Sequence, residues 1–87
     1  MQTGYGVTLF LNGKPQGLAG DTIFENESEA LNYLVNLALT SQQDFLSEGY
    51  AKVEFNVDMV KKCIKLKTFN SNVRYELTNV FIVEKRC

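Results

Sequence analysis

Residues 50–57 read Tyr-Ala-Lys-Val-Glu-Phe-Asn-Val, and this stretch decides the fold class. Small or apolar side chains at Ala51, Val53, Phe55 and Val57 alternate with polar ones at Lys52, Glu54 and Asn56. Successive side chains of a strand point to opposite faces of a sheet. The stretch therefore predicts a strand with one face on a core and the other in water.

Two further strands are expected after it. In 63–67, Ile64 and Leu66 should face the core while Cys63, Lys65 and Lys67 face out. The next begins at Val73, with a bulge or bend near Asn79 and a final part, 80–83, that is apolar on both faces; two separate strands are the alternative. Turns are expected at Asp58-Met59 and at Asn70-Ser71-Asn72.

The chain begins with a predicted hairpin. Residues 5–11 alternate, with Val7, Leu9 and Leu11 on one face and Thr8 and Phe10 on the other. Asn12-Gly13 follows, and this dipeptide favours a type I′ turn because both central residues need positive φ. The returning segment, 16–23, contains two glycines and follows Pro15, which indicates a weak edge strand.

One helix is expected between the hairpin and the later strands. It should begin after Asn26, as a capping box with Glu29, and run to about Ser47, with Gly49 ending it. The predicted core face comprises Leu31, Leu34, Val35, Ala38, Phe45 and Leu46. The predicted solvent face comprises Asn32, Tyr33, Asn36, Thr40 and Gln43.

These segments predict a single α+β domain over residues 1–87 in the order ββαβββ. One helix should pack on a mainly antiparallel sheet of four or five strands. A length of 87 residues, 45% of them hydrophobic, suits one domain. The 22% of charged residues and the net charge of −1 do not match a disordered chain.

The sequence shows neither a signal peptide at its start nor an apolar run long enough to span a membrane. A cytoplasmic protein with no membrane contact is therefore expected. Cys63 and Cys87 could pair, but two cysteines in such a chain favour free thiols.

Catalytic patterns are missing from the sequence. It contains no histidine, and its two cysteines do not have zinc-ligand spacing. The stretch Gly17-Leu18-Ala19-Gly20 lacks the Lys-Ser/Thr pair of a phosphate-binding loop. We therefore expect no enzyme activity, no metal and no cofactor.

Charge is divided between the two parts of the chain. Residues 1–50 hold one base and six acids, a sum of −5, whereas residues 51–87 hold eight bases and four acids, a sum of +4. An acidic helix side and a basic sheet side are predicted.

The first candidate site is an acidic surface at the helix start. It comprises Asp21, Glu25, Glu27, Glu29 and the aromatic Tyr33. Such a cluster could dock on a basic groove of another protein, with the tyrosine as a buried anchor. The alternative is ordinary charge at a helix N-terminus.

The second candidate is the basic outer face of the sheet, suited to single-stranded nucleic acid. It comprises Lys52, Lys65, Lys67, Arg74 and Phe10, with Lys61 and Lys62 at the rim and Phe69 as a further exposed aromatic. The alternative is a solvated face with cross-strand pairs to Glu54 and Glu76. The overall pI of about 5.3 counts against nucleic acid. A third candidate is a sheet edge at 16–23 that pairs with a second copy, as in a homodimer, or with a partner strand.

The layout resembles that of small phage-encoded inhibitors of host defence, the anti-CRISPR type. The resemblance rests on the Asn12-Gly13 hairpin, the helix from Asn26, the three-strand meander and the acidic stretch 21–29. It implies a non-catalytic inhibitor that occupies a partner's nucleic-acid site in the cytoplasm of a bacterial host. A protein–protein binding role through the acidic surface is thus the leading expectation. Nucleic-acid binding and assembly through a sheet edge are the alternatives.

Overall fold

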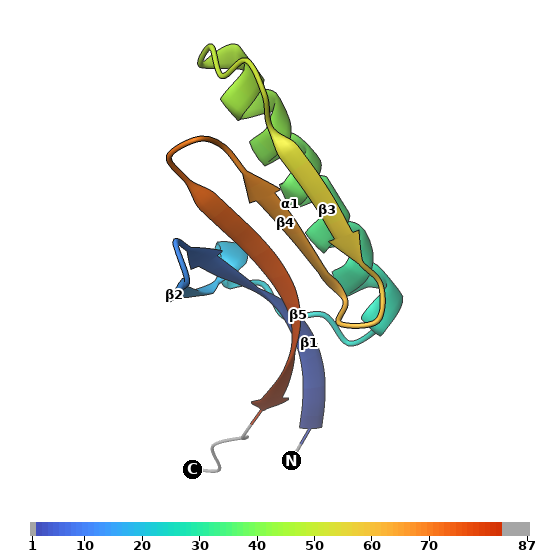
Figure 1. Cartoon of the computed structure of the whole chain (residues 1–87). Coiled ribbons are helices and arrows are strands. Elements are labelled where there is room, and N and C mark those ends of the chain that lie inside the picture. Colours follow the sequence, from blue (N-terminus) through green and yellow to red (C-terminus); the bar gives the residue numbers. More distant parts are fainter. Residues whose placement is uncertain (1, 83–87) are drawn as a thin grey trace.

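The computed structural model describes residues 2–82, except for the side chains of Gln2, Asp21, Phe81 and Ile82. Its elements are β1 (Gln2–Leu11), β2 (Lys14–Leu18), the 3-10 turn η1 (Ala19–Asp21), α1 (Glu27–Ser47), β3 (Glu54–Asp58), β4 (Cys63–Lys67) and β5 (Asn72–Ile82). The five strands form one antiparallel sheet in the order β2-β1-β5-β4-β3, and α1 covers one face of it (Figure 1). The predicted α+β class and the order ββαβββ are confirmed.

The core lies between α1 and the inner face of the sheet. Its buried members are Val7, Leu34, Ala38, Ile64, Leu66, Val73 and Tyr75. The strand residues among them occupy alternate positions of β1, β4 and β5, as the sequence alternation predicts. The core thus fixes which side chains remain on the opposite, outer face.

The helix is rotated relative to the sequence prediction. Ala30, Leu34 and Ala38 are its buried residues, and Tyr33 packs against the core. Val35, placed in the predicted core face, is 42% exposed. Leu46 is exposed as well, so its assignment to the core face was also wrong. Apolar residues cover more than one flank of this helix, so 3.6-residue periodicity alone did not identify the side that packs.

The two ends of α1 differ in how their backbone groups are satisfied. Asn26 has the extended backbone of an N-cap but makes no side-chain cap hydrogen bond, so the predicted capping box does not form. At the other end Gly49 has φ of 98° and donates its N–H to the Leu46 carbonyl. Tyr50 N–H donates to the Phe45 carbonyl, and the two rings pack edge to face at 5.3 Å. These contacts form a Schellman motif with its apolar contact, confirming Gly49 as the stop.

The N-terminal hairpin turns as predicted. Asn12 and Gly13 have φ of 51° and 83°, the combination of a type I′ turn. The returning strand β2 is a short edge strand, and its pairing with β1 shifts register between Thr8 and Phe10. Pro15 lies within it, opposite Phe10. The weak edge strand expected here is therefore present, although it begins at Lys14.

The last three strands form the expected meander, with local differences. Ala51 and Val57 are exposed rather than buried, because β3 is an edge strand that starts only at Glu54. Cys63 is only 4% exposed although it belongs to the outward set of β4. The two turns span residues 59–62 and 68–71, so Asn72 already belongs to β5.

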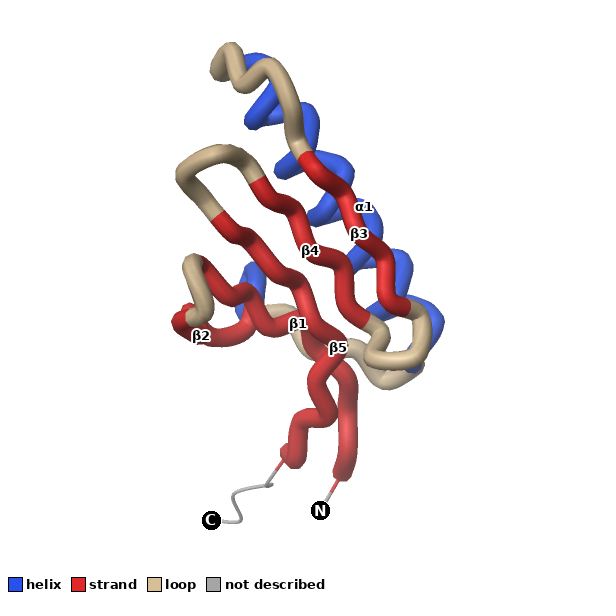
Figure 2. Tube along the Cα trace, in the orientation of Figure 1, coloured by secondary structure: helices blue, strands red, loops and turns tan. Residues whose placement is uncertain are grey.

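Strand β5 is one continuous strand, and its pairing with β1 runs without a shift from Leu11↔Val73 to Gln2↔Ile82. The bulge predicted near Asn79 is therefore absent, and β5 instead curves along its length (Figure 2). The ends of β1 and β5 project together beyond β4, and the described molecule is elongated, 53 × 23 × 20 Å. The prediction that residues 80–83 are covered on both faces concerns mostly residues whose side chains lie outside the described part of the chain.

Candidate functional site

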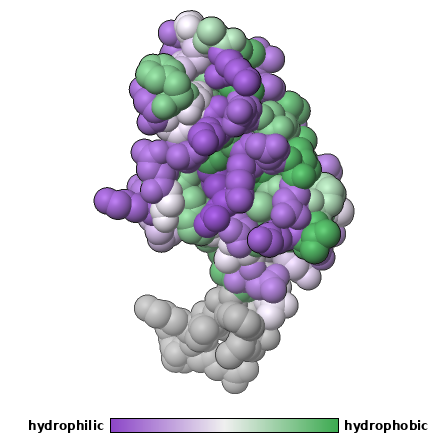
Figure 3. All heavy atoms as spheres, viewed as in Figure 1, coloured by the Kyte–Doolittle hydropathy of each residue, from purple (hydrophilic) through white to green (hydrophobic). Residues whose placement is uncertain are grey.

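The outer face of the sheet brings the basic residues together in cross-strand rows. One row runs Phe10, Arg74, Lys65, Asn56 across β1, β5, β4 and β3. The next row runs Asn72, Lys67, Glu54. Lys65, Lys67 and Arg74 are thus immediate neighbours, and we call them the basic cluster. Figure 3, which views this face, shows hydrophilic residues across β3, β4 and β5.

Arg74 lies with its guanidinium over the Phe10 ring. Its guanidinium carbon lies 4.0 Å from the ring centroid, which is cation–π geometry. Its Nε lies 3.5 Å from a Glu76 carboxylate oxygen, an ion pair without a hydrogen bond. That buried N–H has no hydrogen-bond partner among the described residues. The guanidinium thus contacts both Phe10 and Glu76, while its Nε–H donates no hydrogen bond to a described residue.

A shallow hollow of about 430 Å³ accompanies the basic cluster. Its lining includes Phe10, Asn12, Asn56, Lys65, Lys67 and Arg74. Lys65 and Lys67 are exposed, and neither forms an ion pair with a described residue. Two ammonium groups without an ion-pair partner among the described residues and one guanidinium thus line the same hollow. This arrangement suits phosphate oxygens.

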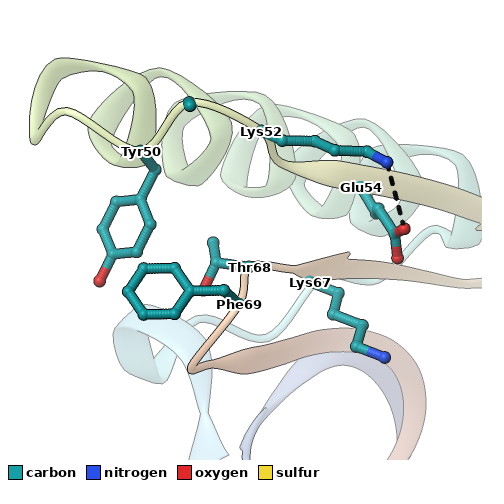
Figure 4. Close-up of a pocket in the computed structure, with 7 residues that line it drawn as sticks. Tyr50, Lys52, Glu54, Lys67, Thr68 and Phe69 are labelled. Atoms are coloured by element: carbon teal, nitrogen blue, oxygen red, sulfur yellow. Dashed lines mark ion pairs between the residues drawn. The ribbon is translucent and has the colours of Figure 1, made fainter.

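A second hollow, of about 300 Å³, adjoins the first at the C-terminal end of α1 (Figure 4). Tyr50 and Phe69 form one side of it, with ring centroids 5.7 Å apart. Phe69 is 89% exposed, so its ring is accessible at the tip of the β4–β5 turn. Lys52 extends along β3 towards Glu54, 3.9 Å away, and Lys67 lines both hollows. Lys67 therefore links the basic cluster to an aromatic pair in which the Phe69 ring is exposed.

The sequence prediction for the basic face named Lys52, Lys65, Lys67, Arg74 and Phe10, and the structure places all of these on the outer side of the sheet or at its rim. It missed Tyr50 as a surface aromatic. The Schellman motif that follows Gly49 turns Tyr50 towards Phe69, and only the Gly49-Tyr50 pair in the sequence signalled it.

The acidic surface is less coherent than expected. Glu25 and Glu29 are exposed, but Glu27 forms an ion pair with Lys62. Tyr33 is half-buried, which corrects the expectation of an exposed anchor. Its ring packs on Phe24 at 5.2 Å.

The Tyr33 hydroxyl also donates to the Ala19 carbonyl at 3.4 Å. The ring therefore fills the space between α1 and the segment after β2. The side chain of Asp21 lies outside the described residues.

Neither a metal site nor a membrane helix is found in the described part of the chain. No group of three or more His, Cys, Asp or Glu side chains within it could hold a metal ion. Among the described residues, α1 is not apolar enough over its length to cross a membrane. Cys63 carries a buried free thiol, and Cys87 lies outside the described residues.

Comparisons with known proteins found no matching family model, no similar curated protein and no similar solved structure.

Proposed function

We propose that this chain is a non-catalytic binding protein whose outer sheet face holds single-stranded nucleic acid. The observation that carries the proposal is the basic cluster, Lys65, Lys67 and Arg74, on adjacent positions of one face beside Phe10. Proteins that bind single strands without sequence preference combine a positively charged groove for the backbone with aromatic side chains on which the bases stack.

Each part of the face has a role in this proposal. The two lysines supply mobile point charges for backbone phosphates. The Arg74 guanidinium, which lies over Phe10, offers a group on which a base can stack. The exposed Phe69 ring, packed beside Tyr50, offers a second stacking surface.

The spacing suits a short segment of nucleic acid. Phe69 lies four positions beyond Lys65, which is about 13 Å along a strand and its turn at roughly 3.3 Å per residue. The track from Arg74 through Lys67 to Phe69 therefore spans a few nucleotides, near the lower end of the roughly 4–16 nucleotides that compact single-strand binders cover. The protein would act where such strands are accessible, which in this proposal is the cytoplasm.

Fluorescence anisotropy with labelled mixed-sequence oligonucleotides at several salt concentrations tests the proposal. Three phosphate contacts, from Lys65, Lys67 and Arg74, predict a slope of log K against log salt of about −2, at about −0.7 per contact. The variant Lys67→Glu should weaken binding strongly. Its matched control is Lys14→Glu, which makes the same charge change away from the basic cluster. Absence of binding by the wild-type chain at low salt overturns the proposal.

A second candidate is favoured by the exposure of Glu25 and Glu29 at the start of α1. In this alternative the chain is a small inhibitor that docks the acidic end of the helix on the basic nucleic-acid groove of another protein. Capture of a partner from bacterial lysate, lost with Glu25→Lys and Glu29→Lys but kept with Asp44→Lys and Glu48→Lys, would support it. Equal capture by both double variants removes this surface.

A further inference from the structure

The two edges of the sheet are protected to different extents. Strand β2 carries Pro15 and a register shift, both of which obstruct pairing with another strand. Strand β3, at the opposite edge, is regular from Glu54 to Asp58 and contains neither proline nor bulge. Within residues 2–82 it has a strand neighbour on one side only, β4. Edges of this kind are where a further strand adds to a sheet.

The hydrogen bonds of β4 show which backbone groups of β3 point outward. Thr68 N–H donates to the Ser71 carbonyl, and Leu77 N–H donates to the Lys62 carbonyl. Both pairs follow the β4–β5 register, so even-numbered residues of β4 direct their backbone groups to β5 and odd-numbered ones to β3. Through the β3–β4 register, the even-numbered residues of β3 bond to β4. The N–H and C=O groups of Phe55 and Val57 therefore face the free edge.

An apolar surface borders this free edge on the helix side. Tyr33 contacts Ala19 and Phe24, so its flank of α1 faces β1 and β2. Leu31, Val35, Leu39 and Leu46 lie roughly 160–240° further round the helix, on the flank that faces β3; we call them the apolar flank. Val35, Leu39 and Leu46 are 42–48% exposed. Figure 2 shows α1 running along the β3 side, and Figure 3 shows apolar surface there.

Strand β3 adds to this surface. Val57 is 52% exposed although its position in the alternation turns it to the helix side with Val53 and Phe55. Val57 is thus exposed on an unprotected edge strand, next to the exposed apolar flank of α1. Another polypeptide could cover this apolar area.

The segment 52–58, which comprises β3 and the two residues before it, is complementary to itself in one antiparallel register. When Phe55 lies opposite Phe55 of a second copy, Val53 lies opposite Val57. Lys52 then lies opposite Asp58, and Glu54 lies opposite Asn56. Phe55 is one of the residues whose backbone groups face out, so this register also satisfies the hydrogen-bond alternation. Lys52 is free to take part, because its 3.9 Å contact with Glu54 is exposed and weak.

The neighbouring register is unfavourable. With Asn56 opposite Asn56, Glu54 of one copy would face Asp58 of the other, twice in each symmetric pair. Like charges directly opposite each other destabilise a sheet. The charges of β3 therefore favour the register centred on Phe55.

We propose that β3 pairs with β3 of a second copy of this chain, antiparallel and centred on Phe55, to form a two-fold dimer with a continuous ten-stranded sheet. The interface is isologous, so Val53 of each copy lies opposite Val57 of the other on the helix side of the junction. This inference is independent of nucleic-acid binding, although the dimer would place two basic clusters on one continuous outer face.

Sedimentation equilibrium over a wide concentration range, without nucleic acid, tests the dimer. The chain should pass from monomer to dimer, and Lys52→Glu should weaken association by about tenfold or more, because two ion pairs become repulsive contacts. The matched control is Lys14→Glu, the same change at the protected edge, which should associate as wild type. A chain that stays monomeric up to millimolar concentration, or equal effects of the two variants, overturns the proposal.

Disulfide trapping tests the register. In a Cys87→Ser background, a mixture of Glu54→Cys and Asn56→Cys chains should cross-link to a mixed dimer. Those two positions form a non-hydrogen-bonded pair with Cα atoms about 4.5 Å apart, within the disulfide range. Asn56→Cys alone should stay uncross-linked. Self-cross-linking of Asn56→Cys, or no mixed dimer, overturns the register centred on Phe55.

Discussion

The guanidinium carbon of Arg74 lies 4.0 Å from the centroid of the Phe10 ring, and the two residues are direct cross-strand partners on β5 and β1. This contact joins the N-terminal hairpin to the C-terminal meander on the outer face of the sheet. It also keeps the positive charge of Arg74 in the lining of the hollow that contains Lys65 and next to the carboxylate of Glu76. The pair therefore contributes both to the sheet and to the proposed binding face.

Replacing Arg74 with lysine keeps the positive charge but removes the planar guanidinium, so the two contributions can be measured separately. Arg74→Lys should lower the free energy of unfolding by about 0.5–1 kcal/mol, since an exposed cation–π contact is worth about that much. It should also weaken oligonucleotide binding while leaving the salt slope nearly unchanged, because the positive charge is kept. Urea denaturation and anisotropy titration measure the two effects. Wild-type affinity in this variant would show that the guanidinium plane does not contact the bases.

Tyr33 should behave as a packing residue rather than a partner contact. Tyr33→Ala should cost about 2–3 kcal/mol of unfolding free energy, below the roughly 3–5 kcal/mol of a fully buried aromatic. Tyr33→Phe should cost about 1 kcal/mol or less, the loss of the hydrogen bond to Ala19. Asn32→Ala, at the exposed neighbouring position, is the control and should change little. Unchanged stability of Tyr33→Ala would contradict the packing seen against Phe24.

The strands of this protein were predictable because side-chain alternation reports directly on the two faces of a sheet. Ile64 and Leu66 are buried between the exposed Lys65 and Lys67, as their order in the sequence predicts. The same alternation placed the basic cluster on one face. The Asn12-Gly13 turn was predictable because few dipeptides tolerate two positive φ angles.

The rotation of α1 and the true surroundings of Tyr33 were not predictable in this way. Val35 and Leu34 are both apolar, and only the position of the sheet decides that Leu34 is buried while Val35 is exposed. Tyr33 has a polar group, yet a backbone carbonyl at Ala19 accepts its hydrogen bond. Contacts of this kind join segments far apart in the sequence, and helical periodicity contains no information about them.

Cys63 should react slowly in the folded protein. It is 4% exposed, so a thiol reagent needs local opening of the strand. In a Cys87→Ser background, the native-state labelling rate should fall below the rate in denaturant by at least about a hundredfold. Lys65→Cys in a Cys63→Ala, Cys87→Ser background is the control, since position 65 lies two residues along the same strand and is exposed. Equal rates for the two thiols would contradict the burial of Cys63.

Lys62 combines an unusual backbone conformation with an ion pair, and three variants separate the two. Its φ is 53°, a left-handed conformation that costs a non-glycine residue about 1–2 kcal/mol. The ion pair with Glu27 is partly exposed, so Glu27→Gln should cost no more than about 1 kcal/mol.

Lys62→Ala and Lys62→Gly both lose the ion pair, but only the glycine removes the backbone strain. Glycine also gains entropy in the unfolded chain, which offsets part of this benefit. Lys62→Gly should therefore be more stable than Lys62→Ala by about 1 kcal/mol in chemical denaturation. Equal stability of the two variants would mean that the turn after Asp58 does not hold residue 62 in the left-handed region.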